Sequence, residues 1–169
     1  MIYQATEWLK RLLTSPEVGL DQVYETAAEL GQHRMPPYAA ILIDQDERYR
    51  RIEQKVAFTD DVAANKRIYT YERIRAVLPV SVLLVERDRA RLEALRARFL
   101  AALPPNFVDA QGHTVAVTPQ SGELLEDASR LRGGVAIDIV VEFEGGIYRV
   151  EEVPLFSSFE VSDVAVEKP

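Results

Sequence analysis

Cysteine is absent from this sequence of 169 residues, and histidine occurs only twice. Without cysteine the chain has no disulfide bond, no thiolate metal site and no nucleophilic thiol. The two histidines, His33 and His113, stand in breaks between apolar segments and lack the spacing of motifs such as HExxH. We therefore interpret both as loop residues.

Positive charge is also in the minority. Twenty lysine and arginine residues stand against 27 aspartate and glutamate residues, which gives a formal net charge of −7. Nucleic acid binding requires a basic face that contacts phosphate, so this balance disfavours specific nucleic acid binding. No apolar run approaches the ~20 residues that cross a bilayer, and residues 1–15 lack the apolar core of a signal peptide. We expect no leader and no membrane partner.

Nucleotide-binding and catalytic motifs are missing as well, since neither GxxxxGK[ST], GxGxxG nor GxSxG occurs. The best metal candidate is "DQDE", in which Asp44, Asp46 and Glu47 could offer oxygen ligands to Mg²⁺ or Ca²⁺. The segment lacks the twelve-residue calcium loop, and charge clusters after a strand are usually solvated turns. We therefore predict no cofactor, no metal and no enzymatic activity, with a small metal-binding module as an open alternative.

Helical spacing of apolar residues occurs in three segments. Residues 5–13 and 87–103 place apolar side chains three and four positions apart, with charged residues between them. Asp88 is positioned to cap the second of these helices. A further helix is predicted over residues 21–30, with Asp21 as its cap.

Strand patterns account for most of the remaining apolar residues. The segment 135–143 alternates apolar and acidic residues, as expected for a strand with one buried face. Pro79 lies inside the longest strand-like run and predicts an edge position, a bulge or a bend there. The loop 59–66 and the turn at 109–113 separate neighbouring strands. The predicted strands are residues 39–44, 49–58, 67–86, 114–119 and 135–143.

The pair Gly145-Gly146 predicts a two-residue hairpin turn between Glu144 and Ile147, because glycine adopts positive φ at both central positions. The resulting order of helices, strands, one helix and strands indicates an α+β fold. We expect a largely antiparallel β-sheet with helices packed on one face. Residues 1–150 are predicted to form one domain, and residues 151–169 a C-terminal arm.

The arm keeps an apolar character that needs a partner. Residues 152–166 have no evident strand partner in the chain, so we predict that they lie against a neighbouring subunit or an outer groove of their own domain. Arginines on the helix over 87–103 alternate with acidic residues, which indicates a solvated or intersubunit face. Tyr49, Tyr69 and Tyr71 either contact a partner or cover a sheet face. The residues predicted for an intersubunit interface are Arg89, Arg96, Val153, Leu155, Phe156, Phe159 and Val161.

Four phrases between residues 38 and 150 resemble the tail terminator (tail completion) proteins of long-tailed bacteriophages. "YAAILIDQDERYRR" is similar to the strand with a polar exit that opens such domains. "VLPVSVLLVERDRARLEALRARFLAAL" is similar to their strand followed directly by a helix. "VDAQGHTVAV" and "GGVAIDIVVEFEGGIY" are similar to their closing strands. The two-helix segment at the N-terminus and the long C-terminal arm depart from the smallest members of this family.

This resemblance implies a structural virion protein, present at the head-proximal end of the tail and in the host cytoplasm during assembly. Its subunits would form a ring, usually a hexamer, that caps the tail tube, ends tube polymerisation and joins the head-side connector. Its partners would be its own copies, the tail tube protein and the connector or neck protein, with DNA passing through the ring. Another head–tail connector or neck protein remains an alternative, as does a ferredoxin-like regulatory domain, although the two leading helices fit that fold poorly.

Overall fold

A computed structural model describes residues 2–26, 29, 35–43, 46–125 and 134–155. The chain divides into two compact units. The first, called the core unit here, comprises residues 1–50 and 75–146. The second, called the strand unit, comprises residues 51–74 and the chain from residue 147 onward, of which 147–155 are described.

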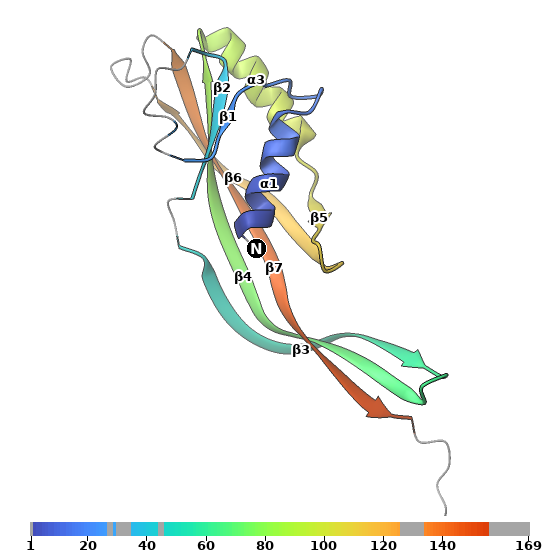
Figure 1. The fold of residues 1–169 in the computed structure, drawn as a ribbon. Coiled ribbons are helices and arrows are strands. Elements are labelled where there is room, and N and C mark those ends of the chain that lie inside the picture. Colours follow the sequence, from blue (N-terminus) through green and yellow to red (C-terminus); the bar gives the residue numbers. More distant parts are fainter. Residues whose placement is uncertain (1, 27–28, 30–34, 44–45, 126–133, 156–169) are drawn as a thin grey trace, which may run out of the picture. The chain divides into compact units, whose positions relative to one another are not determined.

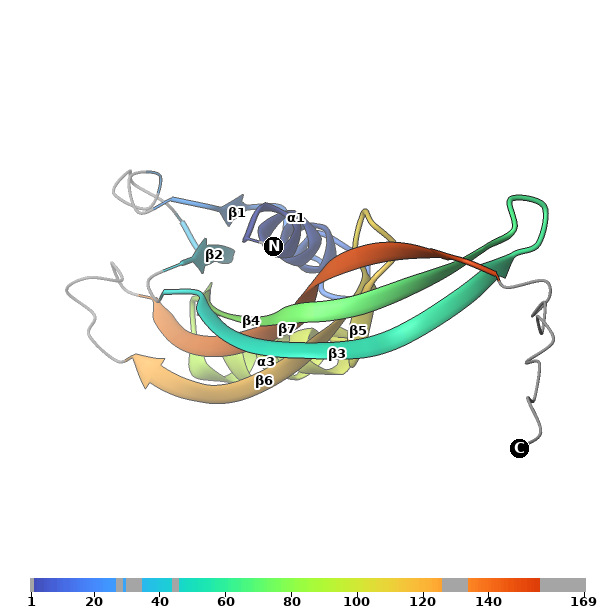
Figure 2. The same ribbon diagram turned by 90° about the horizontal axis from the view of Figure 1, so that it is seen from below.

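Within the described residues, helices α1 and α3 and a mostly antiparallel sheet form the fold, which confirms the predicted α+β class (Figure 1). The strand order is β1-β2-β4-β7-β6-β5, and β3 pairs with β4. Strands β3, β4 and β7 pass from one unit to the other and run alongside one another (Figure 2). The short β1–β2 pair is parallel, whereas the pairs β2–β4, β5–β6 and β6–β7 are antiparallel. The elements are α1 (Ile2–Leu13), β1 (Val23–Tyr24), β2 (Tyr38–Leu42), β3 (Arg48–Asp61), β4 (Lys66–Glu86), α3 (Arg89–Ala102), β5 (Asn106–Val108), β6 (Thr114–Leu125) and β7 (Val135–Pro154).

The hydrophobic core lies within the core unit. Both helices contribute every third or fourth residue to it, as their sequence spacing predicts. Alternate residues of β4 and β7 complete the same cluster, so both helices pack against one face of the sheet. Fully buried members include Leu9, Leu13, Leu78, Val80, Leu92, Leu95, Phe99, Val141 and Phe143.

The helix predicted over 87–103 is confirmed as α3. The carboxylate of Asp88 accepts a hydrogen bond from the backbone N–H of Arg91 at 2.9 Å, and thus caps the helix. The buried stripe consists of Leu92, Leu95 and Phe99, and Leu103 ends the helix. The N-terminal helix is confirmed as well, since Ala5 and Leu9 are fully buried.

The helix predicted over residues 21–30 is wrong at residues 21–26, whereas Glu29 is helical. Val23 and Tyr24 form β1, in register with Ala39 and Ala40 of β2. The backbone N–H of Ala39 donates to the carbonyl of Gln22 at 3.0 Å. A strand partner from a later segment therefore overrides the local helical spacing. The remainder of the predicted helix, at 27–28 and 30, lies outside the described residues.

The hairpin turn predicted at Gly145-Gly146 is also wrong. Strand β7 continues without interruption from Val135 to Pro154. In that strand Glu144 is paired with Ala116 of β6, and the division between the two units falls directly after Gly146. Glycine fits an extended strand as well as a turn, and it often marks the place where a strand changes its surroundings.

Several strand boundaries differ from their predictions. The loop expected over 59–66 shrinks to Val62–Asn65, since β3 extends to Asp61 and β4 begins at Lys66. Pro79 lies buried within β4, two residues before the stretch Ser81–Val85 that pairs with β2. The expected division between residues 150 and 151 falls inside β7.

Truncation of Phe99 should destabilise the fold much more than truncation of its exposed neighbour. Phe99 is fully buried on α3, whereas Leu100 is 38% exposed on the same helix. We expect Phe99→Ala to lower the free energy of unfolding by about 3–5 kcal/mol, since both transfer energy and cavity cost contribute. Leu100→Ala serves as the matched control and should cost less than about 1 kcal/mol, as is usual for exposed positions. Urea denaturation followed by circular dichroism measures both, and equal losses would contradict the assignment of the core.

Candidate assembly surface

The strand unit is a three-stranded sheet with almost no buried side chains. It consists of residues 51–61 of β3, 66–74 of β4 and 147–154 of β7. Among residues 51–74 and 147–155, only Glu72 is buried. No apolar side chain of these residues belongs to the hydrophobic core. Three strands generally need an apolar face or a packed helix to be stable, so this sheet depends on other contacts.

Large apolar side chains of the strand unit face solvent instead. Phe58 is 58% exposed, Val150 61% and Val62, in the turn after β3, 80%. Val56 and Ile147 are also about half exposed. Contiguous apolar surface on a soluble protein commonly marks an interaction site.

One continuous set of aromatic rings and cations crosses all three strands of this unit, and we call it the aromatic–cation cluster. Its rings come from β3 and β4. Its cations come from each of the three strands. The cluster consists of Lys55, Phe58, Arg67, Tyr69, Tyr71 and Arg149.

The three rings form a row. The ring centroids of Phe58 and Tyr69 lie 6.4 Å apart, and those of Tyr69 and Tyr71 lie 6.2 Å apart. The rings are tilted by 50° and 48° to each other, so their faces do not form a flat platform. Such tilted pairs are typical of rings that pack against other side chains.

Each ring of the row has a cation over it. The guanidinium of Arg67 lies 5.0 Å from the centroid of Phe58, and Lys55 Nζ lies 4.8 Å from that of Tyr69. The guanidinium of Arg149 lies 5.6 Å from the centroid of Tyr71. These distances are within the range of cation–π attraction, which grows when water is excluded from the pair. A partner that covers the cluster would therefore strengthen contacts that already exist.

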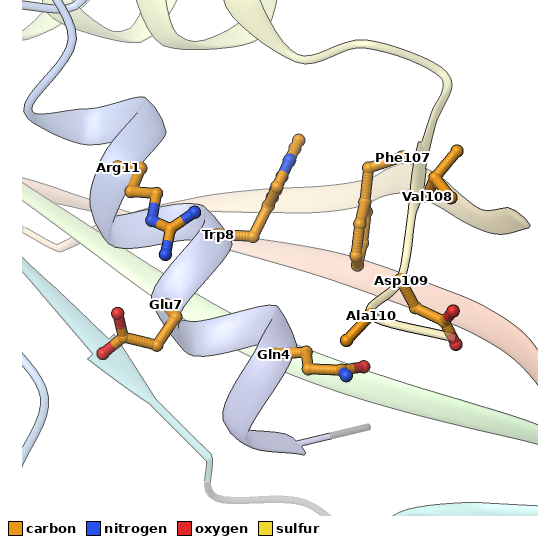
Figure 3. Close-up of a pocket in the computed structure, with 8 residues that line it drawn as sticks. All are labelled: Gln4, Glu7, Trp8, Arg11, Phe107, Val108, Asp109 and Ala110. Carbon is orange, nitrogen blue, oxygen red and sulfur yellow. The ribbon is translucent and has the colours of Figure 1, made fainter. Parts of the chain in front are cut away.

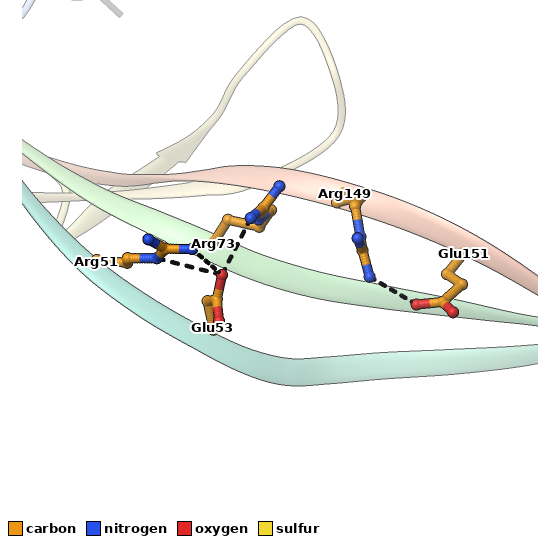
Figure 4. Close-up of polar contacts among 5 residues, drawn as sticks. All are labelled: Arg51, Glu53, Arg73, Arg149 and Glu151. Atoms are coloured by element: carbon orange, nitrogen blue, oxygen red, sulfur yellow. Dashed lines mark hydrogen bonds and ion pairs between the residues drawn. The ribbon is translucent and has the colours of Figure 1, made fainter.

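Ion pairs hold the neighbouring part of the sheet (Figure 4). Glu53 Oε1 accepts from Arg51 Nη2 at 2.8 Å and from Arg73 Nη2 at 3.0 Å. Arg149 donates to Glu151 at 2.8 Å. Glu53, Tyr71, Arg73 and Arg149 line a shallow hollow of about 260 Å³.

Glu53 has an unusual backbone conformation, with φ of 55°. A non-glycine residue in the left-handed region is uncommon within a strand and is typical of bulges and functional segments. The arginines on both sides of its carboxylate lower the pKa of Glu53, with Arg51 the stronger cause. Similarly, the hydrogen bonds from Arg67 Nε and Nη2 lower the pKa of Asp60.

Two of the predicted interface residues, Val153 and Leu155, lie at the end of β7 in the strand unit, where both are half-buried. The backbone N–H of Leu155 donates to the carbonyl of Asn65 at 2.9 Å, and Lys66 Nζ pairs with Glu152 at 2.7 Å. These contacts place the start of the predicted arm beside the β3–β4 turn. Phe156, Phe159 and Val161 lie outside the described residues.

The other two predicted interface residues lie on α3 in the core unit. Arg89 is exposed, and Arg96 pairs with Glu93 at 2.8 Å, one helical turn away. This pair is an ordinary solvated helix contact. The structure therefore places Val153 and Leu155 in the strand unit and Arg89 and Arg96 in the core unit.

The metal candidate gains no support from the described residues. Within them, no group of three or more histidine, aspartate or glutamate side chains is arranged to hold a metal ion. Glu47 Oε2 accepts a hydrogen bond from the hydroxyl of Tyr49 at 2.9 Å, which raises the pKa of Tyr49. Asp44 lies outside the described residues, as does His33. His113 lies in the turn that Asp109 organises through a 2.8 Å hydrogen bond from the His113 backbone N–H.

The core unit has a hollow of its own, of about 320 Å³, between α1 and the turn after β5 (Figure 3). Trp8 and Phe107 form its apolar wall, with ring centroids 5.1 Å apart and planes 18° apart. Both rings also pack edge-on against Phe143 of the core. The wall is thus an outer part of the hydrophobic core, and Glu7, Arg11 and Asp109 are the charged residues that line the hollow.

Sequence reasoning identified Tyr69 and Tyr71 but missed Lys55, Phe58, Arg67 and Arg149. These four residues are far apart in the sequence and meet only through strand pairing. The signal that could have found them is the long β3–β4 hairpin, whose register places Phe58 near Tyr69 and Asp60 near Arg67. Because a turn was predicted at Gly145-Gly146, the sequence did not indicate that Arg149 lies on the same strand as residues 135–143.

No known protein-family model matches this sequence, and no curated protein matches it significantly. No helix in the part of the chain that the structure describes is long and apolar enough to cross a membrane.

The two arginines beside Glu53 should have unequal effects on its ionisation. We expect Arg51→Ala to raise the pKa of Glu53 toward its ordinary value, and Arg73→Ala to raise it less. Because the pKa is lowered in the folded state, the stabilisation is present above the unfolded pKa and is lost as the pH falls through the folded value. Carboxyl-detected NMR titration measures the shift, and Arg89→Ala on α3 is the control. An unchanged Glu53 pKa in Arg51→Ala would contradict the ion-pair geometry.

Proposed function

We propose that this protein is a structural subunit of a bacteriophage tail, which assembles into a ring that caps the tail tube. The ring, in its usual form a hexamer, ends tube polymerisation and forms the joint to the head-side connector. The protein is a tail terminator in this proposal and performs no reaction. The residues that mediate contact between subunits lie in the strand unit.

The observation that carries this proposal is the exposed sheet of the strand unit. Its described residues bury no apolar side chain, although Phe58, Val62 and Val150 are large and apolar. Burial of one such side chain contributes about 1.5–3 kcal/mol, so a neighbouring subunit that covers several of them would bind favourably. An assembling protein accounts for this surface more simply than a monomeric enzyme does.

Two further features support the proposal. The α+β fold with a mostly antiparallel sheet agrees with the order of elements on which the family resemblance rests. The net charge of −7 suits a ring through which DNA passes, because an acidic lumen does not retain the phosphate backbone.

Electron microscopy of the purified protein tests the proposal directly. We expect closed rings, either of the protein alone at high concentration or after mixing with purified tail tubes. Light scattering should give the mass of a ring, and the protein should co-sediment with tail tubes rather than with filled heads. A strict monomer in solution that also leaves tail tubes uncapped would refute the proposal. Co-sedimentation with filled heads only would instead favour a connector or neck protein.

A further inference from the structure

We propose that residues 156–166 of one copy lie across the aromatic–cation cluster of a neighbouring copy and pair with the free edge of its strand β3. This inference rests on the proposed function, since it requires that copies assemble. It identifies the surface that receives the C-terminal segment and the residues that recognise it.

The receiving edge is available in the strand unit. There β4 pairs with β3 on one side and with β7 on the other, as the contacts at Asn65 and Lys66 with Leu155 and Glu152 show. The opposite edge of β3 has no strand partner among the described residues. An unpaired edge offers backbone N–H and C=O groups to an added strand. Beyond Glu53, whose φ is 55°, residues 54–61 form the remainder of β3 and are the stretch of edge considered.

The side chains beside this edge favour an apolar and acidic strand. Phe58 and Val56 project from β3 and are about half exposed. Lys55 supplies positive charge above the ring of Tyr69, whereas Arg67, above the ring of Phe58, is already paired with Asp60. Aromatic rings and arginine are the residue types that contribute most to the centre of protein interfaces.

Residues 156–166 match this surface. Their sequence, "FSSFEVSDVAV", contains two phenylalanines and three valines, with Glu160 and Asp163 between them. It includes no lysine, arginine, glycine or proline. In an extended chain Phe159 and Val161 would share one face, and Val164 and Val166 the opposite face, so both faces offer apolar side chains. The carboxylates complement the charge of Lys55.

Geometry favours the tail of a neighbour over the tail of the same chain. In the strand unit β7 and the free edge of β3 lie on opposite sides of the sheet, because β4 is between them. Adjacent strands are ~4.8 Å apart, so a tail that leaves β7 must cross ~14 Å to pass β3. Extended chain covers ~3.3 Å per residue, and the crossing would therefore use about four residues, including Phe156 and Phe159. A neighbouring copy can present the entire segment instead.

Cysteine cross-linking tests this arrangement, and the absence of native cysteine makes it clean. One copy carries Thr59→Cys on β3 and another carries Ser162→Cys in the C-terminal segment. We expect a mixture of the two to form a disulfide-linked dimer under mild oxidation, in excess of either variant alone. Ala94→Cys, exposed on α3, replaces Thr59→Cys in the control mixture and should not cross-link.

A double variant with both cysteines in one chain distinguishes the two sources of the segment. Linked dimers and larger species are expected from it. A cross-linked monomer from the double variant, with no dimer from the mixture, would overturn the inference, because the tail would then fold onto its own chain. Absence of any cross-link would overturn it as well.

A binding measurement tests the recognising residues. A labelled synthetic peptide of residues 155–168 is titrated with the protein that lacks 156–169, and fluorescence anisotropy reports binding. We expect Tyr69→Ala to weaken the affinity at least tenfold, and a scrambled peptide not to bind. A labelled thymidine oligonucleotide is the competing ligand. If the oligonucleotide binds through Tyr69 and the peptide does not, the cluster is a nucleic acid site and the inference is wrong.

The same truncation separates this inference from the proposed function. If the protein without residues 156–169 still forms normal rings, the inference is overturned and the proposed function stands. If the full-length protein forms no rings alone or on tail tubes, the proposed function fails, whereas cross-linking between copies would still support the inference.

Discussion

Continuous backbone pairing along β4 is the interaction on which both units depend. This strand runs from Lys66 to Glu86, and it pairs with β2, β3 and β7. In the core unit its side chains Leu78 and Val80 also enter the hydrophobic core. In the strand unit the same backbone ladder continues without such a core. Hydrogen bonds in a ladder satisfy buried polar groups and fix register, but each contributes only about 0.5–1.5 kcal/mol net, so they need apolar burial beside them.

The two units are therefore stabilised by different forces. Helices α1 and α3 cover the sheet of the core unit, and non-directional apolar burial dominates there. The strand unit relies on directed contacts, such as the ion pairs of Glu53 and Asp60 and the cations over Phe58 and Tyr69. Exposed ion pairs add little stability in water. Their value increases when a partner excludes solvent, and this is the physical reason for assigning the strand unit to assembly.

The sequence predicts those elements whose signals are local. The helices over 5–13 and 87–103 and the strand over 135–143 follow from apolar periodicity alone, and the α+β class follows from their order. The predicted helix at Val23 failed because its partner Ala39 comes from a later segment. The hairpin turn predicted at Gly145-Gly146 was wrong because glycine is equally compatible with an extended chain. The candidate site was predicted only in part. The aromatic side chains Tyr69 and Tyr71 were recognised in the sequence. Phe58 and Arg149 join the site only because strand pairing brings them beside Tyr69 and Tyr71.

The separation of β4 from β7 in the sequence has a consequence for the order in which the chain folds. The β3–β4 hairpin closes over a turn of four residues, Val62–Asn65, and can form early. Strand β7 begins at Val135, about fifty residues after β4 ends, and must close a much longer loop before it pairs. During synthesis the edge of β4 that pairs with β7 therefore stays unpaired until β7 has been synthesised. In the proposed assembly, a subunit would therefore become competent to bind its neighbours only after its own sheet is complete.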